Sequence, residues 1–320
     1  MPGGYGGKFI MKKWITITLM MVMVLCTACA SATTVGICQL VQHEALDAAT
    51  KGFKDALSAK MPDVKFDEQN ASGDAVNCAT IVNTFVSNGV DLIMANATAP
   101  VQAAVAATAD IPILGTSVTD YATALGVTEF TGVSGINVSG TTDLAPLDGQ
   151  ANMVKELVPD AKKVGILYCS AEANSVYQVM TIRGYLEGLG YECAEFSFMD
   201  SNDVASVAQT AADNCDVLYI PTDNTCAAYT ETIANVVLPA KLPVIAGEEG
   251  LCRGCGVATL TISYYDLGYA TGEMAYEILA NGADVSAMPI KSAPNFVKKY
   301  NAANAAELGV TIPEGYTALE

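Results

Sequence analysis

The sequence is poor in the residue types on which most enzymes and nucleic-acid-binding proteins depend. Its 320 residues include one histidine, His43, so a histidine-rich metal centre is excluded and a Ser-His-Asp triad would need this side chain. It has 16 basic against 34 acidic residues and a formal charge of −18, which repels nucleic acids and anionic lipid surfaces. We therefore expect no nucleic-acid partner and no metal site.

Nucleotide and sugar chemistry also lack their usual signatures. There is no GxxxxGK[ST] phosphate loop and no G-x-G-x-x-G after a first strand. Glu248 and Glu249 are adjacent and would point to different sides, unlike the facing carboxylates of a glycosidase. His43 stands alone at the start of a predicted helix, where a cap or a binding contact is its usual role. The sequence predicts neither an enzyme nor a bound cofactor.

The N-terminal region contains an apolar run that is short for a membrane span. The run from Trp14 to Leu25 follows Lys12 and Lys13, and it has fewer than the about 20 residues that a span needs. Small residues follow it. This pattern is typical of a secretory signal peptide, with an uncleaved anchor as the alternative. We assign residues 1–32 to a leader, expect export, and place the start of translation at Met11, because MPGGYGGKFI does not fit a leader.

Two cleavage sites compete at the end of the leader. Thr27-Ala28 before Cys29 resembles the lipobox of bacterial lipoproteins, although Cys26 stands where that pattern has Leu. A lipid on Cys29 would hold the protein at the outer face of the cytoplasmic membrane. Ala28-Cys29-Ala30 and Ala30-Ser31-Ala32 instead fit ordinary signal peptidase, which would release a periplasmic or secreted protein. We favour lipidation of Cys29.

Most of the cysteines after the leader lie in apolar stretches. A free cysteine packs there as a small hydrophobe. Core packing is therefore expected for Cys38, Cys169, Cys193 and Cys215. Only Cys252-Arg-Gly-Cys255 has motif spacing, but it lacks the second pair of a structural zinc site and precedes a predicted strand, unlike a redox pair. A local disulfide or two free thiols are the alternatives.

The apolar residues are mostly aliphatic. Hydrophobic residues make up 51% of the chain and aromatics 7%, as is usual for parallel-sheet folds. From Thr33, short β-branched runs alternate with Ala-rich helical stretches, which predicts βα units. The first series has strands at 35–41, 64–67, 92–95 and 112–114 and helices at 45–57, 75–88 and 100–107. The second has strands at 164–168, 192–198, 217–220 and 244–246 and helices at 175–189, 204–212 and 226–236.

The predicted fold is therefore α/β, with two Rossmann-like, doubly wound lobes. A strand at 256–262, a helix at 267–279 and an extended segment at 289–300 are too little for a third domain, so they must complete the two lobes. The chain would then cross between the lobes more than once, forming a multi-strand hinge suited to closure around a ligand. We expect an N-terminal lobe of residues 33–145 plus about 250–280, and a C-terminal lobe of 146–249 plus about 281–320.

Polar residues gather in the turns that follow the predicted strands. In open α/β sheets, ligands bind beyond the carboxyl ends of the strands, where helix N-termini present free N–H groups. Ser, Thr, Asp and Asn also cap helices, so capping is the alternative for each residue taken alone. Several such turns from both lobes would nevertheless face one cleft that holds carboxylates and hardly any cation. Such a cleft suits a neutral or zwitterionic solute.

Different residues of this cleft would bind the positive and the negative group of a zwitterion. Asp223 and Glu248 would hold an ammonium group. The hydroxyls of Thr116, Ser117 and Ser175, with helix N-terminal amides, would receive a carboxylate without an arginine. We expect a protein that captures a small solute and performs no chemistry on it. An enzyme is the alternative, but no acid, base and nucleophile come together.

The same turns carry a resemblance to a known family. In chain order its blocks are QLVQHEALDAATKGF (39–53), TAPVQA (98–103), TSVTD (116–120), SAEANSVYQV (170–179), PTDNT (221–225), IAGEEG (245–250) and YYDLGYATGEMA (264–275). From about Val35 to Val310 the chain resembles the substrate-binding proteins of ABC transporters with the type I periplasmic-binding fold, in the family whose characterised members bind tryptophan and related aromatic amino acids. The resemblance implies a capture protein that feeds a membrane permease.

The resemblance also implies ligand contacts on these turns. The candidates are Gln39, Thr98, Thr116, Thr119, Asp120, Ser170, Asn174, Ser175, Asp223, Asn224 and Glu248, to which His43 and Ser117 are added. Tyr264 is expected to pack in the core or hinge. This chain departs from the family at Glu44, where a Pro usually follows the His of the first turn, and at the unusual Cys252 and Cys255. Both departures adjoin the expected cleft.

The expected function is therefore that of a solute receptor for an ABC importer. We expect an exported monomer that binds an aromatic amino acid such as tryptophan and closes over it about the hinge. A receptor for a sugar or another small solute and a sensory binding module are the alternatives.

Overall fold

The computed structural model describes Met1 and residues 32–319. The predicted start at Met11 and the predicted lipidation site Cys29 lie outside the described residues, as does nearly all of the predicted leader. Among the helices that are described, none combines the length and the apolar character needed to cross a membrane.

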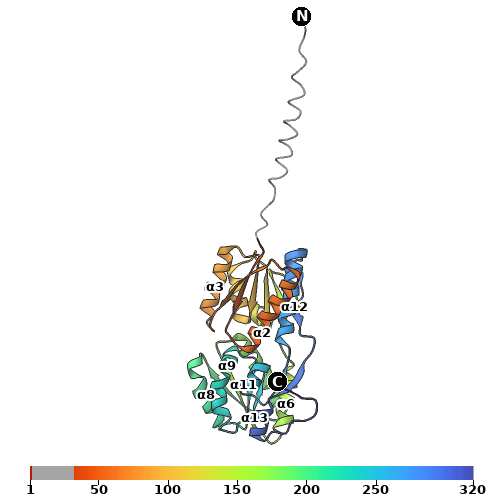
Figure 1. Cartoon of the computed structure of the whole chain (residues 1–320). Coiled ribbons are helices and arrows are strands. Elements are labelled where there is room, and N and C mark those ends of the chain that lie inside the picture. The colour runs from red at the N-terminus through yellow and green to blue at the C-terminus, as the bar shows by residue number, and fades with distance from the viewer. Residues whose placement is uncertain (2–31, 320) are drawn as a thin grey trace. The chain divides into compact units, whose positions relative to one another are not determined.

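The first lobe contains a six-stranded, all-parallel sheet of order β11-β5-β4-β3-β1-β2 (Figure 1). Its strands are β1 (Thr34–Gln39), β2 (Lys65–Asn70), β3 (Leu92–Asn96), β4 (Ile113–Val118), β5 (Val138–Thr142) and β11 (Lys291–Ser292). Strands β3 and β4 are buried along their whole length, as expected where helices cover both faces. Strand β2 is mostly exposed and polar, because it lies at an edge.

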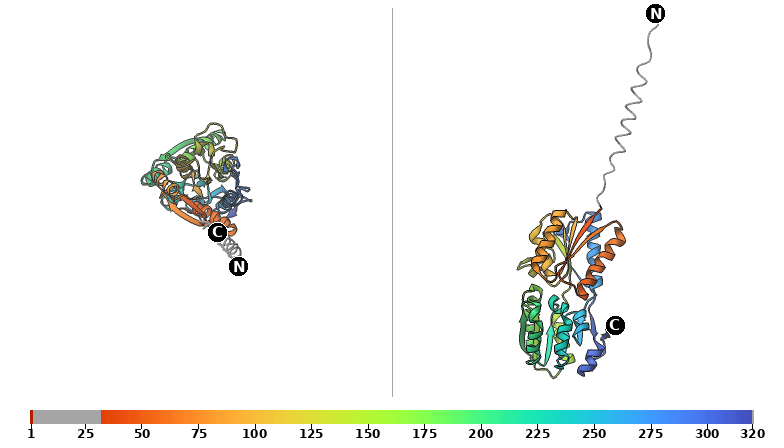
Figure 2. Two further views of the ribbon diagram at one scale, coloured as in Figure 1. Left: turned by 90° about the horizontal axis from the view of Figure 1, so that it is seen from above. Right: turned by 60° about the vertical axis from the view of Figure 1, so that its left-hand side comes forward.

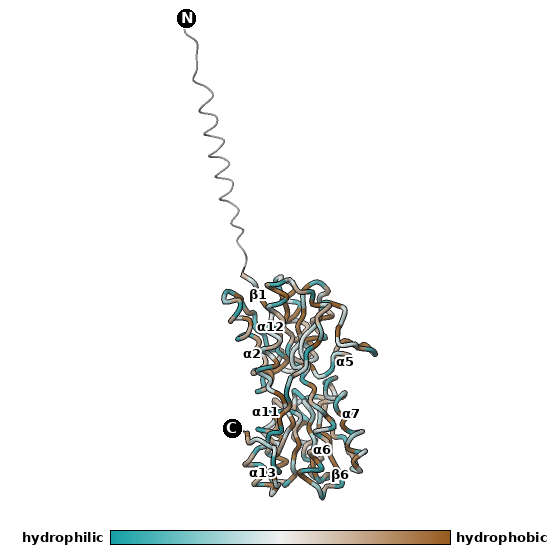
Figure 3. Tube along the Cα trace, turned by 90° about the vertical axis from the view of Figure 1, so that its right-hand side faces the viewer, coloured by the Kyte–Doolittle hydropathy of each residue, from teal (hydrophilic) through white to brown (hydrophobic). Residues whose placement is uncertain are grey.

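Helices cover both faces of this sheet. The elements are α2 (Glu44–Lys60), α3 (Ala75–Asn88), α4 (Thr98–Ala107), α5 (Tyr121–Leu125), α12 (Tyr264–Asn281) and the 3₁₀ turn η2 (Val285–Ala287). Phe53 of α2 and Met274 of α12 pack in one core cluster with β1, β3 and β4. Cys78 and Phe85 of α3 pack in another, together with α4 and α5. Helices α2 and α12 each contain both hydrophobic and hydrophilic residues, as expected for helices that pack with one face on a sheet (Figure 3).

The second lobe contains a seven-stranded sheet of order β13-β12-β10-β9-β8-β6-β7, with β12 antiparallel to β10. Its strands are β6 (Lys163–Cys169), β7 (Glu192–Phe198), β8 (Val217–Ile220), β9 (Val244–Ala246), β10 (Ala258–Thr261), β12 (Val297–Tyr300) and β13 (Thr317–Ala318). Its helices are α6 (Leu147–Leu157), α7 (Ala173–Gly188), η1 (Ser201–Asp203), α8 (Val204–Ala212), α9 (Asn224–Ala228), α10 (Thr230–Val237), α11 (Glu249–Gly254) and α13 (Ala302–Leu308). They lie on both faces of the sheet (Figure 2).

The predicted α/β fold with two doubly wound lobes is confirmed. The structure also shows to which lobe each of the C-terminal segments belongs. Helix α12 packs on the first lobe and β11 pairs with β5, so residues 264–292 return to that lobe. We expected this return at about 250–280. The difference arises because β10 extends the second sheet between β9 and β12, so the chain remains in the second lobe until residue 261.

The hinge consists of three chain crossings within the described residues. They follow β5, β10 and β11, because each of these strands is succeeded by an element of the other lobe. Asp143 lies in the first crossing and Tyr264 ends the second. The Tyr264 hydroxyl donates to Asp143 Oδ2 at 2.9 Å, and Asp143 Oδ1 is buried without a partner. Tyr264 is buried at the hinge, in agreement with the expectation of core or hinge packing.

Helices α2 and α12 touch through their backbones. A Cβ atom on Gly268 would lie 1.9 Å from the Ala49 carbonyl oxygen, and one on Gly52 would lie 2.1 Å from the Tyr265 carbonyl oxygen. Only glycine permits this approach, because any side chain would separate the helices. The second crossing leads directly into α12, so this contact fastens the hinge to the first lobe.

We predict that Gly268→Ala destabilises the protein. The added methyl group must push α12 away from α2, at a cost of about 1–3 kcal/mol in the free energy of unfolding. Urea or thermal unfolding measures this. Gly184→Ala on α7 is the matched control, since no atom lies within 4 Å of its added Cβ and a helix gains about 0.5–1 kcal/mol from the exchange. Equal stabilities of the two variants would contradict the close contact.

We also predict that Asp143 makes stability depend on pH. Burial raises the pKa of Asp143 from 3.8 to about 6, against the opposing hydrogen bonds from Tyr264 and Thr119. The folded chain therefore keeps a proton that the unfolded chain has lost. The resulting stability is complete below pH 3.8 and disappears as the pH rises through about 6.

Asp143→Asn should remove this dependence. Between about pH 4 and pH 7 the unfolding free energy of the wild type should fall relative to that of Asp143→Asn, by on the order of 2 kcal/mol. Chemical denaturation across this range measures the difference, and the other buried carboxyls cancel because both proteins contain them. Parallel profiles would show that Asp143 titrates normally.

Candidate functional site

A pocket of about 460 Å³ lies between the two lobes. Turns that follow the carboxyl ends of parallel strands line it from both sides, as open α/β sheets lead one to expect. The first lobe contributes Leu40, Val41, Ser72, Gly73, Asp74, Ala75, Thr98, Ala99 and Gln102. The second contributes Cys169, Ala171, Glu172, Ala173, Asn174, Met199, Asp200, Ser201, Asn224, Thr225, Ala228 and Tyr229.

A larger groove, of about 570 Å³, lies on the first lobe alone. Its charged side chains already have partners, since Lys54 Nζ is 2.6 Å from Glu68 Oε2 and Lys51 pairs with Asp55. The pocket between the lobes joins turns from two lobes that can move about the hinge. It is therefore the better candidate for solute capture.

The first-lobe wall of the pocket contains a helix start without a cap. Ala97, the N-cap residue of α4, makes no side-chain hydrogen bond and has a φ of 99°, a backbone conformation that non-glycine residues rarely adopt. Thr98 Oγ1 is buried beside it and has no hydrogen-bond partner. Strained backbone and unsatisfied polar atoms concentrate at ligand sites. The first turn of α4 therefore has donors to offer a ligand.

Glu172 organises the second-lobe wall. Its carboxylate accepts from the backbone N and Nδ2 of Asn224 at 3.0 and 2.6 Å, and from the backbone N and Oγ1 of Thr225 at 2.8 Å each. These bonds hold the start of α9 against the start of α7. Helix α7 begins at Ala173 and, like α4, has no side-chain cap, so a second free helix N-terminus lines the pocket.

His43 and Asn224 connect the two lobes. His43 Nε2 lies 3.2 Å from Asn224 Oδ1. Because Asn224 Nδ2 donates to Glu172, its Oδ1 must accept, and His43 therefore carries its proton on Nε2. Burial lowers the pKa of His43, so the ring is neutral. Its Nδ1 is then a buried acceptor without a partner.

Asp223 and Glu248, predicted to hold an ammonium group, act in the structure as helix caps. Asp223 accepts from the Cys169 and Cys226 backbone N–H groups at 2.7 and 2.8 Å and from Ser175 Oγ at 2.7 Å. Glu248 accepts from the backbone N–H groups that follow it, at 2.6 and 2.5 Å. Burial raises the pKa of each carboxyl to about 7. Neither residue lines the pocket of about 460 Å³, although Glu248 lines two smaller pockets between the lobes.

The other predicted site residues divide between the pocket wall and the structure behind it. Thr98, Asn174 and Asn224 line the pocket. Ser117 lies at the end of β4 with a φ of 54° and a buried hydroxyl that has no partner. The rest bond within the protein: Gln39 to Asp47 and Thr50, Thr116 to Thr141, the Thr119 carbonyl to Thr142 Oγ1, Asp120 to the Thr123 amide, Ser170 to Phe198 and Ser175 to Asp223.

Several pocket residues were absent from the sequence-based candidates. Asp74 and Asp200 follow the edge strands β2 and β7, and the same turn rule would have found them had it been applied to those strands. Glu172 lies in a turn that was predicted to face the cleft, but nothing in the sequence set its carboxylate apart from the neighbouring polar residues. Met199 and Tyr229 supply apolar surface to the pocket, and nothing in the sequence marks them.

The cysteines form no metal site or disulfide among the described residues. Cys252 and Cys255 are free and buried, and burial raises the pKa of the Cys255 thiol to about 12. The raised pKa disfavours the reactive thiolate form of Cys255. Cys38 and Cys169 are buried as predicted, whereas Cys193 and Cys215 are only half-buried. No group of three or more possible metal ligands occurs in the part of the chain that the structure describes.

Comparisons with known proteins identify the family of this chain. The model of the family described as ABC transporter substrate binding protein matches residues 34–319. The chain is 40% identical over 260 residues to a tyrosine-binding protein of Clostridioides difficile strain R20291, a match that covers 80% of this chain and 75% of the relative.

Two solved structures add information on the state of the lobes. An ABC domain in complex with L-Trp from Streptococcus pneumonia superposes with a TM-score of 0.85 at 32% identity, covering 90% of this chain and 100% of that chain. The ligand-free, open structure of a substrate-binding protein with adhesive properties from Clostridium difficile superposes with a TM-score of 0.68 at 36% identity, covering 90% and 99%. The chain thus superposes better on the L-Trp complex than on the ligand-free, open structure, although it is more identical in sequence to the latter. The chain belongs to the family of ABC transporter substrate-binding proteins.

Proposed function

We propose that the pocket between the lobes captures an aromatic amino acid, tryptophan or tyrosine, for delivery to an ABC permease. Membership of the family already makes the protein an extracytoplasmic binding protein, not an enzyme, that takes a small-molecule solute and serves an ABC permease. The relatives whose names include tyrosine and L-Trp support the choice of solute. An aromatic amino acid is favoured over the sugar that was the alternative.

The observation that carries the proposal is the unpaired Thr98 hydroxyl beside the uncapped start of α4. A buried hydroxyl without a partner costs about 1–3 kcal/mol, so a ligand acceptor is the natural complement. The α-carboxylate of an amino acid supplies such an acceptor, and the positive end of the helix dipole favours it. No arginine or lysine lines the pocket, so amides and hydroxyls must do the binding.

The ammonium group of the solute also has candidate partners on the walls of the pocket. Asp74, Glu172 and Asp200 line the pocket. We place the ammonium group beside Asp74 and Asp200, whose carboxylates each accept one backbone N–H at Oδ1, because both oxygens of Glu172 already accept from Asn224 and Thr225. The oxygens of Asp223 and Glu248 are already occupied by backbone and hydroxyl donors, so they are the weaker choice. Leu40, Val41, Met199 and Tyr229 offer apolar and aromatic surface for a ring.

Titration with a panel of solutes tests the proposal. The only tryptophan, Trp14, lies in the predicted leader, so the chain from residue 33 onward contains none. Adding L-tryptophan while exciting tyrosine should therefore produce energy transfer to the bound ligand. Calorimetry should show binding of L-tryptophan or L-tyrosine and none of D-glucose or D-ribose. Binding of a sugar and of no amino acid would overturn the assignment.

We predict that Thr98→Val weakens amino-acid binding without destabilising the protein. Valine keeps the shape and removes the hydroxyl, so affinity should fall about tenfold, in line with a lost hydrogen bond to a charged group. Because the hydroxyl has no partner in the protein, the melting temperature should stay equal or rise. Thr84→Val, on the exposed part of α3, is the control. Unchanged affinity in Thr98→Val would exclude this hydroxyl from the site.

We further propose that residues 1–32 direct export, that Cys29 carries a lipid, and that the mature protein is a monomer. The charge and apolar pattern of the leader and the lipobox-like residues before Cys29 support the first two points. Labelling of cells with a palmitate analogue should mark the wild type, and Cys29→Ala should lose the label and appear in the medium. A wild type that remains unlabelled would instead support release by ordinary signal peptidase.

A further inference from the structure

We propose that Glu44 and Arg253 form a latch that holds the lobes closed and so sets part of the affinity for the solute. Neither residue lines the candidate pocket of about 460 Å³, although both line a smaller pocket of about 240 Å³ between the lobes, so both would act as positioning residues. The inference rests on solute capture by closure, and it does not depend on which solute is captured.

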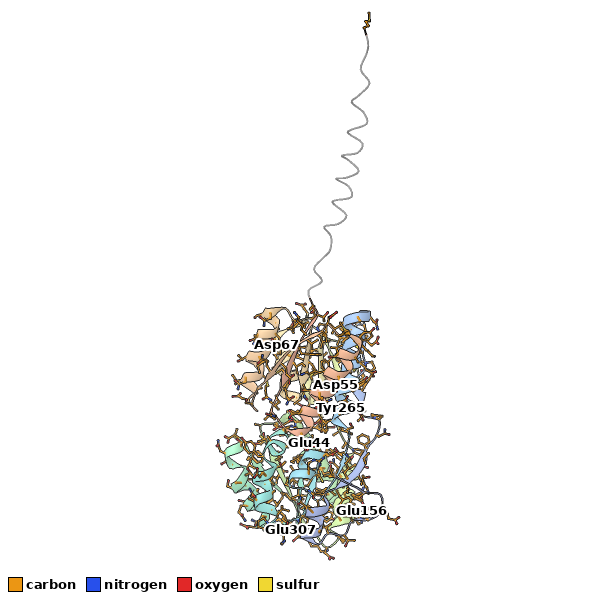
Figure 4. All side chains as sticks on the ribbon, in the orientation of Figure 1. Glu44, Asp55, Asp67, Glu156, Tyr265 and Glu307 are labelled. Atoms are coloured by element: carbon orange, nitrogen blue, oxygen red, sulfur yellow. The ribbon has the colours of Figure 1, made fainter. Side chains whose placement is uncertain are left out.

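The two residues belong to different lobes and meet at their junction. Arg253 Nε lies 3.1 Å from Glu44 Oε1 and 3.0 Å from Oε2, although 209 positions separate the residues in the chain. Glu44 lies where the first lobe meets the second (Figure 4). Among the ion pairs of residues 32–319, this is the one that joins the lobes, since every other pair lies within a single lobe.

Arg253 is held in position by its own lobe. Its Nη2 lies 2.9 Å from Glu249 Oε1, one turn earlier on α11, and Lys299 Nζ lies 2.5 Å from Glu249 Oε2. The guanidinium is therefore oriented before Glu44 arrives, which lowers the entropy lost on closure. Both partners also stand at favourable helix ends, with Glu44 in the first turn of α2 and Arg253 in the last turn of α11.

Closure needs such a contact because the walls of the cleft are acidic. Asp74 of the first lobe and Glu172 and Asp200 of the second line the pocket, where no lysine or arginine offsets them. Bringing the lobes together therefore raises the repulsion between them. An attraction that exists only in the closed form offsets part of this cost. Solute and latch then stabilise the same state, so each increases the apparent affinity of the other.

The size of the effect follows from exposure. The side chains of Arg253 and Glu44 are 37% and 47% exposed, so water and salt screen their attraction. Exposed pairs contribute modestly, and we expect about a two- to fivefold change in Kd when the pair is broken. The same screening makes the latch testable, because the contribution of the ion pair to the affinity must disappear at high ionic strength.

A double-mutant cycle tests the latch. The Kd of L-tryptophan and L-tyrosine is measured by calorimetry for wild type, Glu44→Gln, Arg253→Gln and the double variant, in about 20 mM and about 500 mM NaCl, between which the Debye length falls several-fold. Each single variant should bind two- to fivefold more weakly at low salt. The double variant should bind no more weakly than the singles, and the difference from wild type should vanish at high salt.

Arg183→Gln is the matched control, because Arg183 pairs with Glu187 on the outer side of α7 at similar exposure, 46% and 49%, and should leave the Kd unchanged. Additive effects of Glu44→Gln and Arg253→Gln, or effects that persist in high salt, would overturn the latch. If neither amino acid binds the wild type, the proposed solute is wrong, and D-glucose or D-ribose, whichever binds, becomes the probe for the same cycle. The two failures are thus distinguished.

Discussion

The backbone contact between α2 and α12 is the constraint on which the arrangement of the cleft depends. Gly52 and Gly268 let the two helices touch, and the ends of these helices carry the residues that act between the lobes. Helix α2 begins at Glu44 just after His43, and α12 begins at Tyr264, which bonds to Asp143 in the hinge. A shift of either helix would therefore move the hinge and the interlobe contacts together. The close packing of the two helices therefore fixes the position of the hinge relative to the first lobe.

The helix starts near the pocket differ in whether a side chain caps them. Asp223, Glu248, Asp120 and Asp74 each satisfy backbone N–H groups at the start of a helix. Helices α4 and α7 have no such side chain, and both start at the pocket. Asp223 and Glu248, which were predicted to bind the ligand, therefore cap helices outside this pocket, while the uncapped starts of α4 and α7 face it. This division is consistent with a binding protein, since it provides recognition without a reactive group.

Much of the fold could be predicted because parallel βα units leave a strong pattern in the sequence. Buried strands such as β8 and β9 are continuous apolar runs, and helices such as α4 and α8 are rich in alanine. The return of the chain to the first lobe was harder to place, because β10 could continue either sheet until its pairing with β9 was known. The pocket was predicted as a set of turns, and Thr98, Asn174 and Asn224 do line it. The capping roles of Asp223 and Glu248 could not be predicted, because the sequence does not determine whether a carboxylate after a strand faces the cleft or the start of its own helix.

The strongly acidic character of the chain has a consequence for the solutes that reach the pocket. With 34 acidic against 16 basic residues and a pocket wall of Asp74, Glu172 and Asp200, the molecule surrounds its entrance with negative potential. Such a field lowers the local concentration of anions before any contact is made. Aspartate and glutamate would be discriminated against on approach, whereas zwitterions with uncharged side chains would not. The charge of a solute would thus affect its approach before its shape meets the pocket.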